Sequence, residues 1–212
     1  MHVLVAGSHG QVGQHVTRLL AASDHEVHGM VRDEAQTTDV EELGAEPVLA
    51  DLTQDVTSAV RGCDAVVFAA GSGGEDVEGV DRDGAINLIE AAEREDADRF
   101  VMLSSINADS PEDSPEELRP YLNAKAAADE RLRESDLTYT IVRPGALTNE
   151  DGTGRIRTGA DLDRKDGDIP REDAAETLVA ALEMEATYGL TFEVLSGDEP
   201  VEDALADPLN AE

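Results

Sequence analysis

The sequence is poor in basic residues. Lys and Arg together number 16, against 48 Asp and Glu, which gives a formal net charge of −32 at pH 7. Its only lysines are Lys125 and Lys165. A surface this negative repels nucleic-acid phosphates and anionic membranes, so we expect neither nucleic acid nor a membrane as a partner.

The sequence is also poor in cysteine and in long apolar runs. The single Cys63 cannot form an internal disulfide. The chain has no run of about 18 apolar residues, which argues against a transmembrane helix. The first residues, MHVLVAGSHG, lack the basic segment and apolar core of a signal peptide. We therefore expect a soluble, cytoplasmic protein.

The carboxylates are spread along the whole chain, so an acidic interaction tail does not explain them. We interpret them as an adaptation to a high-salt cytoplasm, as in a halophile. At molar salt the electrostatic screening length falls to about 3 Å, and surface carboxylates then repel one another only weakly. The scarcity of lysine agrees, because short, well-hydrated carboxylates replace its long apolar side chain.

Short apolar runs alternate with amphipathic stretches. We predict strands at residues 3–6, 26–31, 47–50, 64–70, 100–103, 137–142 and 190–195. We predict helices at residues 11–22, 34–43, 79–95, 115–135 and 173–185. This alternation predicts a parallel sheet covered on both faces, in a doubly wound, Rossmann-like α/β fold of three αβα layers.

The length of 212 residues and the 40% share of hydrophobic residues suit a single domain over 1–212. In such a fold the ligand cleft lies at the carboxyl ends of the strands. The segment 148–168 is rich in glycine and charge, and we expect it to be a loop that faces the substrate.

The turn after the first strand carries the pattern G-x-x-G-x-x-G and leads into an amphipathic helix. Glycines there let the backbone turn tightly and approach a pyrophosphate, which the amides of the helix then bind. A tight structural turn is the alternative. We expect the whole turn to bind a dinucleotide, with its histidine as a solvent-facing loop residue: Gly7, Ser8, His9, Gly10, Gln11, Val12 and Gly13.

The end of the second strand bears on the choice of cofactor. Arg32 favours the 2′-phosphate of NADP, while the following Asp33 would favour the ribose of NAD. Because Arg32 comes first, we expect NADP(H) in preference to NAD(H). The alternative for Arg32 is a surface ion pair with Asp33 or Glu34.

Two later strand ends carry further candidates for cofactor binding. Asp51 and Leu52 are placed to reach an adenine ring, although Asp51 also suits an ordinary helix cap. The small residues Ala69, Ala70 and Gly71 end the fourth predicted strand, where the backbone can lie close to a cofactor.

Tyr121 and Lys125 form the pattern Y-x-x-x-K on a predicted helix, where positions i and i+4 share one face. A nearby ammonium stabilises a phenolate, so Tyr121 is a candidate proton donor or acceptor. The alternative is a packed tyrosine beside a solvated lysine. Ser104 and Ser105 follow the fifth predicted strand, where a hydroxyl can bind a substrate oxygen or cap a turn.

Several stretches make the chain resemble the short-chain dehydrogenase/reductase superfamily, especially its small atypical members, which are sugar-epimerase-like or NmrA-like. These stretches are GSHGQVGQ, MVRDEAQ, ADLTQ, VDRDGAINLIEAA, RFVMLSS, YLNAK, YTIVRPG and IPREDAA. The resemblance implies that Ser105 polarises a substrate carbonyl, Tyr121 is the acid/base and Lys125 holds the nicotinamide ribose. It also implies cofactor contacts from Arg32, Asp51, Ser104, Arg143, Pro144 and Gly145.

The chain also departs from the extended members it resembles. They are usually about 100 residues longer, which disfavours a large nucleotide-sugar substrate here. Asp81 stands about where they carry an asparagine.

We therefore expect an enzyme that transfers a hydride between NADP(H) and a small carbonyl or alcohol, without a metal. One alternative is an NAD-dependent epimerase or dehydratase acting on a nucleotide sugar, and another is a non-catalytic, NmrA-like regulator that binds a dinucleotide. The expected partner is a small-molecule substrate, and the chain is expected to be a monomer or a homodimer.

The charge pattern predicts that the fold requires salt. Lowering KCl from molar to millimolar should unfold the protein or lower its Tm strongly, because repulsion among the carboxylates is then no longer screened. Thermal melts followed by circular dichroism at the two salt concentrations measure this. A Tm that does not change between them would contradict the interpretation.

Overall fold

Continuous apolar runs build the centre of the sheet. In the computed structural model, which describes residues 1–163 and 167–209, the first strand carries Val3, Leu4, Val5 and Ala6, all fully buried. Strands without polar alternation are typical of a sheet covered on both faces. The main sheet contains β1 His2–Ala6, β2 Glu26–Val31, β3 Glu46–Leu49, β4 Ala65–Phe68, β5 Arg99–Leu103, β6 Thr138–Pro144, β8 Arg155–Gly159, β10 Leu190–Ser196 and β11 Glu199–Pro200.

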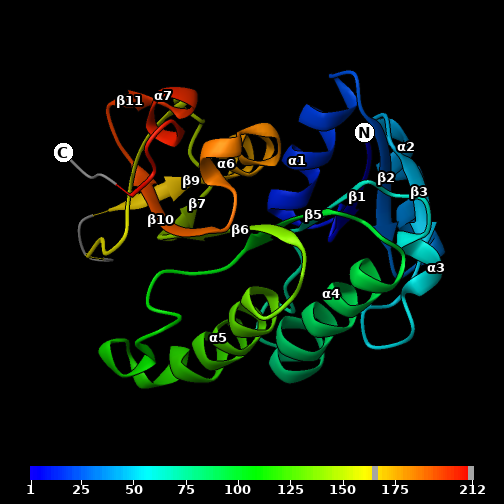
Figure 1. Ribbon diagram of the computed structural model, residues 1–212, viewed down its shortest axis with the longest axis horizontal. Coiled ribbons are helices and arrows are strands. Elements are labelled where there is room, and N and C mark those ends of the chain that lie inside the picture. The colour runs from blue at the N-terminus through cyan, green and yellow to red at the C-terminus, as the bar shows by residue number, and fades with distance from the viewer. Residues whose placement is uncertain (164–166, 210–212) are drawn as a thin grey trace.

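The order of strands is β11-β8-β10-β6-β5-β4-β1-β2-β3 (Figure 1). The run from β3 to β6 is parallel throughout, and β10 continues it beside β6. The chain leaves β1 toward β2 and β3, then returns to β4 on the other side. The crevice for a ligand in such a sheet lies at this reversal, between the ends of β1 and β4.

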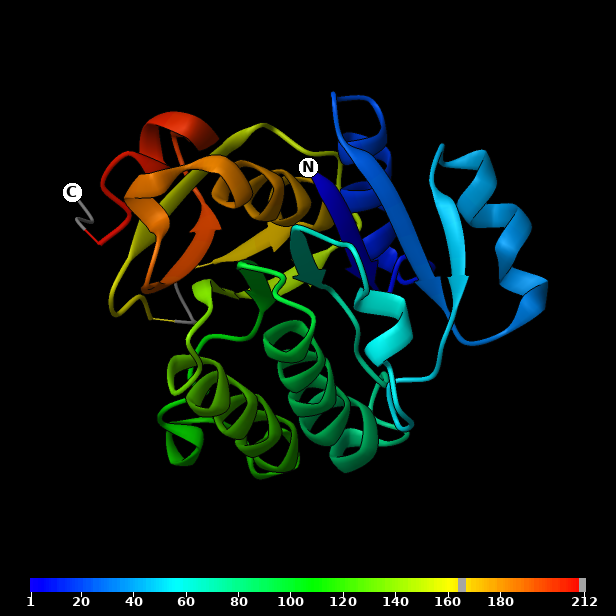
Figure 2. The ribbon, with the colours of Figure 1, turned by 45° about the vertical axis from the view of Figure 1, so that its right-hand side comes forward.

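Helices cover both faces and complete the three predicted layers (Figure 2). One face carries α1 Gln11–Ala21 and α6 Arg171–Glu183, and the other carries α4 Ala85–Arg94 and α5 Arg119–Arg133. Three shorter helices are α2 Thr37–Glu42, α3 Thr57–Val60 and α7 Val201–Leu205. None of the helices in the described part of the chain is both long and apolar enough to cross a membrane.

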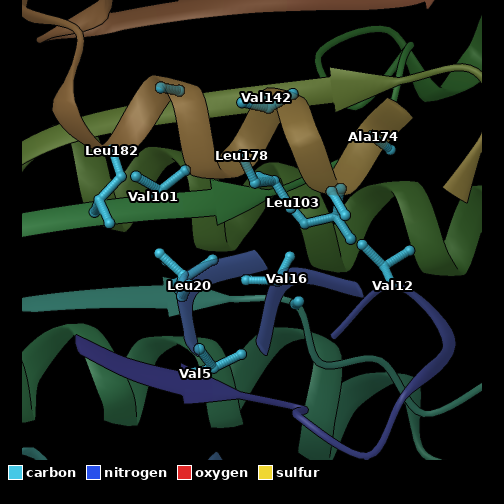
Figure 3. Close-up of a cluster of buried hydrophobic side chains, with 14 of the residues drawn as sticks. Val5, Val12, Val16, Leu20, Val101, Leu103, Val142, Ala174, Leu178 and Leu182 are labelled. Carbon is cyan, nitrogen blue, oxygen red and sulfur yellow. The ribbon is translucent and has the colours of Figure 1, made fainter. Parts of the chain in front are cut away.

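Alternate residues of β1 belong to two separate hydrophobic clusters, one on each face of the sheet. Val5 packs with Val16 of α1 and Leu178 of α6 in a cluster on one face (Figure 3). Leu4 belongs to the cluster on the other face, together with Leu88 of α4. Because the side chains of a strand alternate between faces, one short apolar run anchors both helix layers. The predicted doubly wound α/β fold is confirmed.

The expectation of a loop over residues 148–168 is wrong for part of the segment. Strand β8 pairs antiparallel with β10, so that Gly159 lies opposite Glu193. Ile156 and Thr158 are buried on alternate positions, which is the period of a strand. Two short strands, β7 Ala146–Thr148 and β9 Asp168–Pro170, pair at the ends of this segment. Residues 164–166 lie outside the described residues, and a substrate-facing role for the segment stays a prediction.

Two predicted helices begin later than expected. A π-helical segment, Val77–Gly84, precedes α4 where a regular helix was predicted from residue 79. Before α5 the chain makes two short 3-10 turns, Pro111–Asp113 and Glu116–Leu118. In the π-helical segment, Asp76 accepts a hydrogen bond from Gly79 N at 3.0 Å.

The buried position of Cys63 predicts an unreactive thiol in the native state. Cys63 is 3% exposed, and burial raises the pKa of its thiol to about 11. Since the thiolate is the nucleophile, labelling by DTNB at about pH 8 should be slow in molar KCl and fast after unfolding. The Cys63→Ser variant has no thiol and gives the background signal of the assay. Rapid labelling of the folded protein would contradict this burial.

Candidate functional site

A cleft of about 440 Å³ opens where the strand order reverses. This volume is within the range of small-molecule sites. Many of the residues predicted to bind a cofactor line it, namely Gly7, His9, Gly10, Arg32, Asp51, Leu52, Ala69, Ala70 and Gly71. The wall also contains residues that sequence reasoning did not assign to cofactor binding, namely Met30, Val31, Gln36, Ala50, Thr53, Ser72, Glu75, Asp76 and Val80.

The glycine turn is packed backbone against backbone. Gly7 has φ +83°, and a Cβ placed on it would lie 2.6 Å from Ala70 Cα. A Cβ placed on Gly13 would lie 2.0 Å from Gly7 O. Gly7 and Gly13 are therefore needed by the turn itself, while Gly10 lines the cleft at the start of α1. Ser8 is buried and donates to Met30 O, so its hydroxyl ties the turn to β2.

The start of α1 is open to an anion. No side chain caps its N-terminus, and its first turn contains no acidic residue, although the chain has 48 carboxylates. The free amides and the helix dipole together attract a phosphate group. The turn therefore fits the pyrophosphate of a dinucleotide.

The part of the cleft that follows β2 carries Arg32, which is exposed and lines the wall. Asp33 Oδ1 accepts from Ala35 N at 2.9 Å. Among the described residues no ion pair joins Arg32 to Asp33 or Glu34, so its guanidinium is available to a ligand.

Two other predicted residues that line the cleft are engaged by local contacts. Asp51 Oδ1 accepts from both the backbone N and Oγ1 of Thr53 at 2.9 Å, which agrees with its alternative role as a cap. His9 Nε2 lies 2.9 Å from Asp39 Oδ2 of α2. Both residues line the cleft, with these carboxylate and imidazole groups held by neighbouring protein atoms.

Lys125 and Tyr121 lie beside the carboxyl end of β5. Lys125 Nζ is buried, donates to Leu103 O at 3.0 Å, and lies 5.7 Å from the centroid of the half-buried Tyr121 ring. Leu103 is the last residue of β5, and Ser105 follows it. Ser105 Oγ makes one long hydrogen bond, 3.3 Å to Ile106 O. Helix α5 therefore places the Tyr121 ring beside the ammonium of Lys125, which is bonded to the strand end two residues before Ser105.

The side chains of Ser104 and Arg143 are bonded within the protein. Ser104 Oγ and Arg143 Nε both donate to Asp129 Oδ2, at 2.9 and 3.0 Å, and Arg143 Nη1 lies 2.7 Å from Asp109 Oδ2. The backbone is engaged there as well, because Ser104 N donates to Val142 O, Ile106 N to Pro144 O and Gly145 N to Val194 O. Cofactor contacts from Ser104, Arg143, Pro144 and Gly145 stay predictions, since none of these residues lines the cleft. Sequence reasoning missed Asp129, although it lies one helical turn after Lys125 on the same helix.

Comparison with known proteins identifies a family. The model of the NAD(P)H-binding family matches residues 7–185. The chain is 43% identical to YhfK of Bacillus subtilis strain 168, described as an uncharacterised sugar epimerase, over 97% of this chain and 99% of that one.

Two solved structures have the same fold. A protein from Bacillus halodurans, described as a candidate NAD-dependent epimerase/dehydratase, is 40% identical, with a TM-score of 0.93 over 97% of this chain and 98% of that one. The oxidoreductase ylbE from Lactococcus lactis is 28% identical, with a TM-score of 0.86 over 97% and 95%. The chain therefore belongs to the NAD(P)H-binding family, among the atypical short-chain dehydrogenases/reductases.

Proposed function

We propose that the protein is an oxidoreductase that transfers a hydride between NADP(H) and a small carbonyl or alcohol. The observation that carries the proposal is the position of Tyr121 and Lys125. Both lie at the carboxyl end of β5, on the same side of the sheet as the cleft that suits a dinucleotide. The cofactor, when bound, supplies or accepts the hydride.

The chain's own residues handle the oxygen of the substrate. Ser105 Oγ donates a hydrogen bond to the carbonyl oxygen, since its bond to Ile106 O is long and easily exchanged. Tyr121 Oη gives its proton to this oxygen during reduction and takes it back during oxidation. The ammonium of Lys125 stabilises the resulting phenolate, and its burial strengthens this attraction.

The preference for NADP(H) rests on Arg32. A free guanidinium at the mouth of the cleft suits a 2′-phosphate, which it can bind through two parallel hydrogen bonds. Asp33 offers less to a ribose diol, because one of its oxygens already accepts from Ala35 N.

This preference predicts that NADP⁺ and NADPH raise Tm more than NAD⁺ and NADH. In Arg32→Ala, affinity for NADP⁺ should fall roughly tenfold to hundredfold, the equivalent of one or two charged hydrogen bonds, while affinity for NAD⁺ stays unchanged. Thermal shift in molar KCl measures both effects. Arg94→Ala is the control, because Arg94 pairs with Glu90 away from the cleft. Equal shifts with both dinucleotides would contradict the assignment of Arg32.

The proton-transfer role predicts that Tyr121→Phe lowers turnover by about 10²–10⁴-fold, since general acid catalysis contributes about that much. NADPH affinity should stay the same. Turnover is measured as NADPH consumption with a panel of aldehydes, ketones and quinones. Tyr139→Phe makes the same change near the start of β6, away from the strand end at Leu103, and should retain activity. If Tyr121→Phe retains full activity, the catalytic assignment is wrong.

A second candidate is an epimerase or dehydratase, which oxidises its substrate transiently and then returns the hydride. The descriptions of the Bacillus relatives favour it. Such an enzyme keeps its cofactor bound and shows no net consumption of NADPH, so the same assay separates the two. A regulator without activity is disfavoured by the buried lysine beside Tyr121.

A further inference from the structure

Arg143 is a buried cation held between two carboxylates that come from different parts of the chain. It lies near the end of β6 and is 3% exposed. Its Nε donates to Asp129 Oδ2 of α5 at 3.0 Å, and Asp129 is fully buried. Its Nη1 lies 2.7 Å from Asp109 Oδ2, in the segment between β5 and α5. The planar fork of a guanidinium can bond both carboxylates at once, whereas an ammonium is a single point charge.

The bond to Asp129 fastens the helix of Tyr121 to the sheet. Tyr121, Lys125 and Asp129 follow one another at intervals of four residues, so they lie on one face of α5. Asp129 also accepts from Ser104 Oγ at 2.9 Å and therefore bonds to the ends of both β5 and β6. Because the three residues belong to one continuous helix, the place of Asp129 against the strand ends also sets the place of Tyr121.

Ser105 is held beside Arg143 by the backbone. The residues directly before and after Ser105 donate from their backbone N to Val142 O at 2.8 Å and to Pro144 O at 3.1 Å. These two acceptors are the neighbours of Arg143 in β6. The serine proposed to bind the substrate oxygen and the arginine that fastens α5 are therefore in register with each other.

The connection between Ser105 and α5 is irregular. Residues 106–118 contain turns and two short 3-10 helices, and Asn107 has φ +65°. Asp109 joins this connection to β6, because its carboxylate pairs with Arg143. The guanidinium therefore contacts both the connection and the helix that follows it.

We propose that Arg143 is a positioning residue for the proton transfer. By holding Asp109 and Asp129 together, it sets the place of Tyr121 relative to the serine that binds the substrate oxygen. It acts through these two carboxylates, since its own side chain does not line the cleft. The inference rests on the proposed function for the roles of Tyr121 and Ser105. It gives Arg143 a task different from the cofactor contact that the family resemblance implies.

Fluorine NMR reports the surroundings of Tyr121 without any substrate. The chain has three tyrosines, so labelling with 3-fluorotyrosine gives three signals, which single Tyr→Phe variants assign. Arg143→Lys keeps the buried charge but loses the fork, so the Tyr121 signal should shift in molar KCl. The signals of Tyr139, near the start of β6, and of Tyr188, which stacks on Arg99, should stay in place.

The same variant separates positioning from cofactor binding. Turnover of NADPH with the panel of aldehydes, ketones and quinones should fall by up to about 10²-fold, since a small displacement of a reacting group can cost that much. The Kd for NADPH, measured by isothermal titration calorimetry in molar KCl, should stay the same. If NADPH affinity falls by the same factor as turnover, Arg143 is a cofactor contact and the inference is overturned. An unchanged Tyr121 signal also overturns it.

Two further variants decide the matter if Arg143→Lys does not fold. Arg143→Gln combined with Asp129→Asn removes both buried charges together, so neither is left unpaired. Asp109→Ala changes only an exposed carboxylate. Both should shift the Tyr121 signal and lower turnover, and a signal that stays in place in both overturns the inference.

The matched control is Asp113→Ala, which removes another exposed carboxylate from the same connection and should change neither the signal nor turnover. The proposed function is tested separately by the activity of Tyr121→Phe. If that variant is fully active, the proposed function fails, while the fluorine signal still shows whether Arg143 positions Tyr121.

Discussion

The cleft depends on one close approach of backbone to backbone. A side chain on Gly13 or Gly7 would collide with Gly7 O or Ala70 Cα, respectively, at distances that real Cβ atoms do not adopt. Only glycines therefore let α1 begin directly at the end of β1 while the end of β4 lies against the turn. The same packing leaves the first amides of α1 uncapped at the reversal of the strand order. The absence of a side chain at Gly7 and Gly13 is therefore required both for packing the turn and for forming the anion site.

Helix α5 carries the buried charged residues of the candidate catalytic site. It carries Lys125 and Asp129 one turn apart, and both are almost completely buried. Lys125 lies against Leu103 O and Asp81, while Asp129 accepts from Ser104 and Arg143. Burying a charge costs several kcal/mol unless it is paired, so these partners hold the helix in one position against β5 and β6.

Much of the fold could be predicted because its signals are local. The apolar runs of β1, β4 and β5 indicate buried parallel strands, and the glycine turn indicates where the cleft opens. The spacing of Tyr121 and Lys125 puts both on one helix face. Strand β8 was missed because Ile156 and Thr158 alternate with charged and glycine residues in a short segment, where its pairing with β10 decides the conformation.

The order of residues alone determined the central parallel strands, the longer helices and where a dinucleotide-type turn begins, because periodicity and glycine spacing act over a few neighbouring residues. The partners of the charged side chains depended on the folded chain. Arg143 meets Asp109 and Asp129, and Asp81 meets Lys125, only after β6, α5 and the π-helical segment have packed together. Hydrogen bonds and ion pairs act over a few ångströms in space, so residues distant in sequence acquire their roles from the packing of the layers.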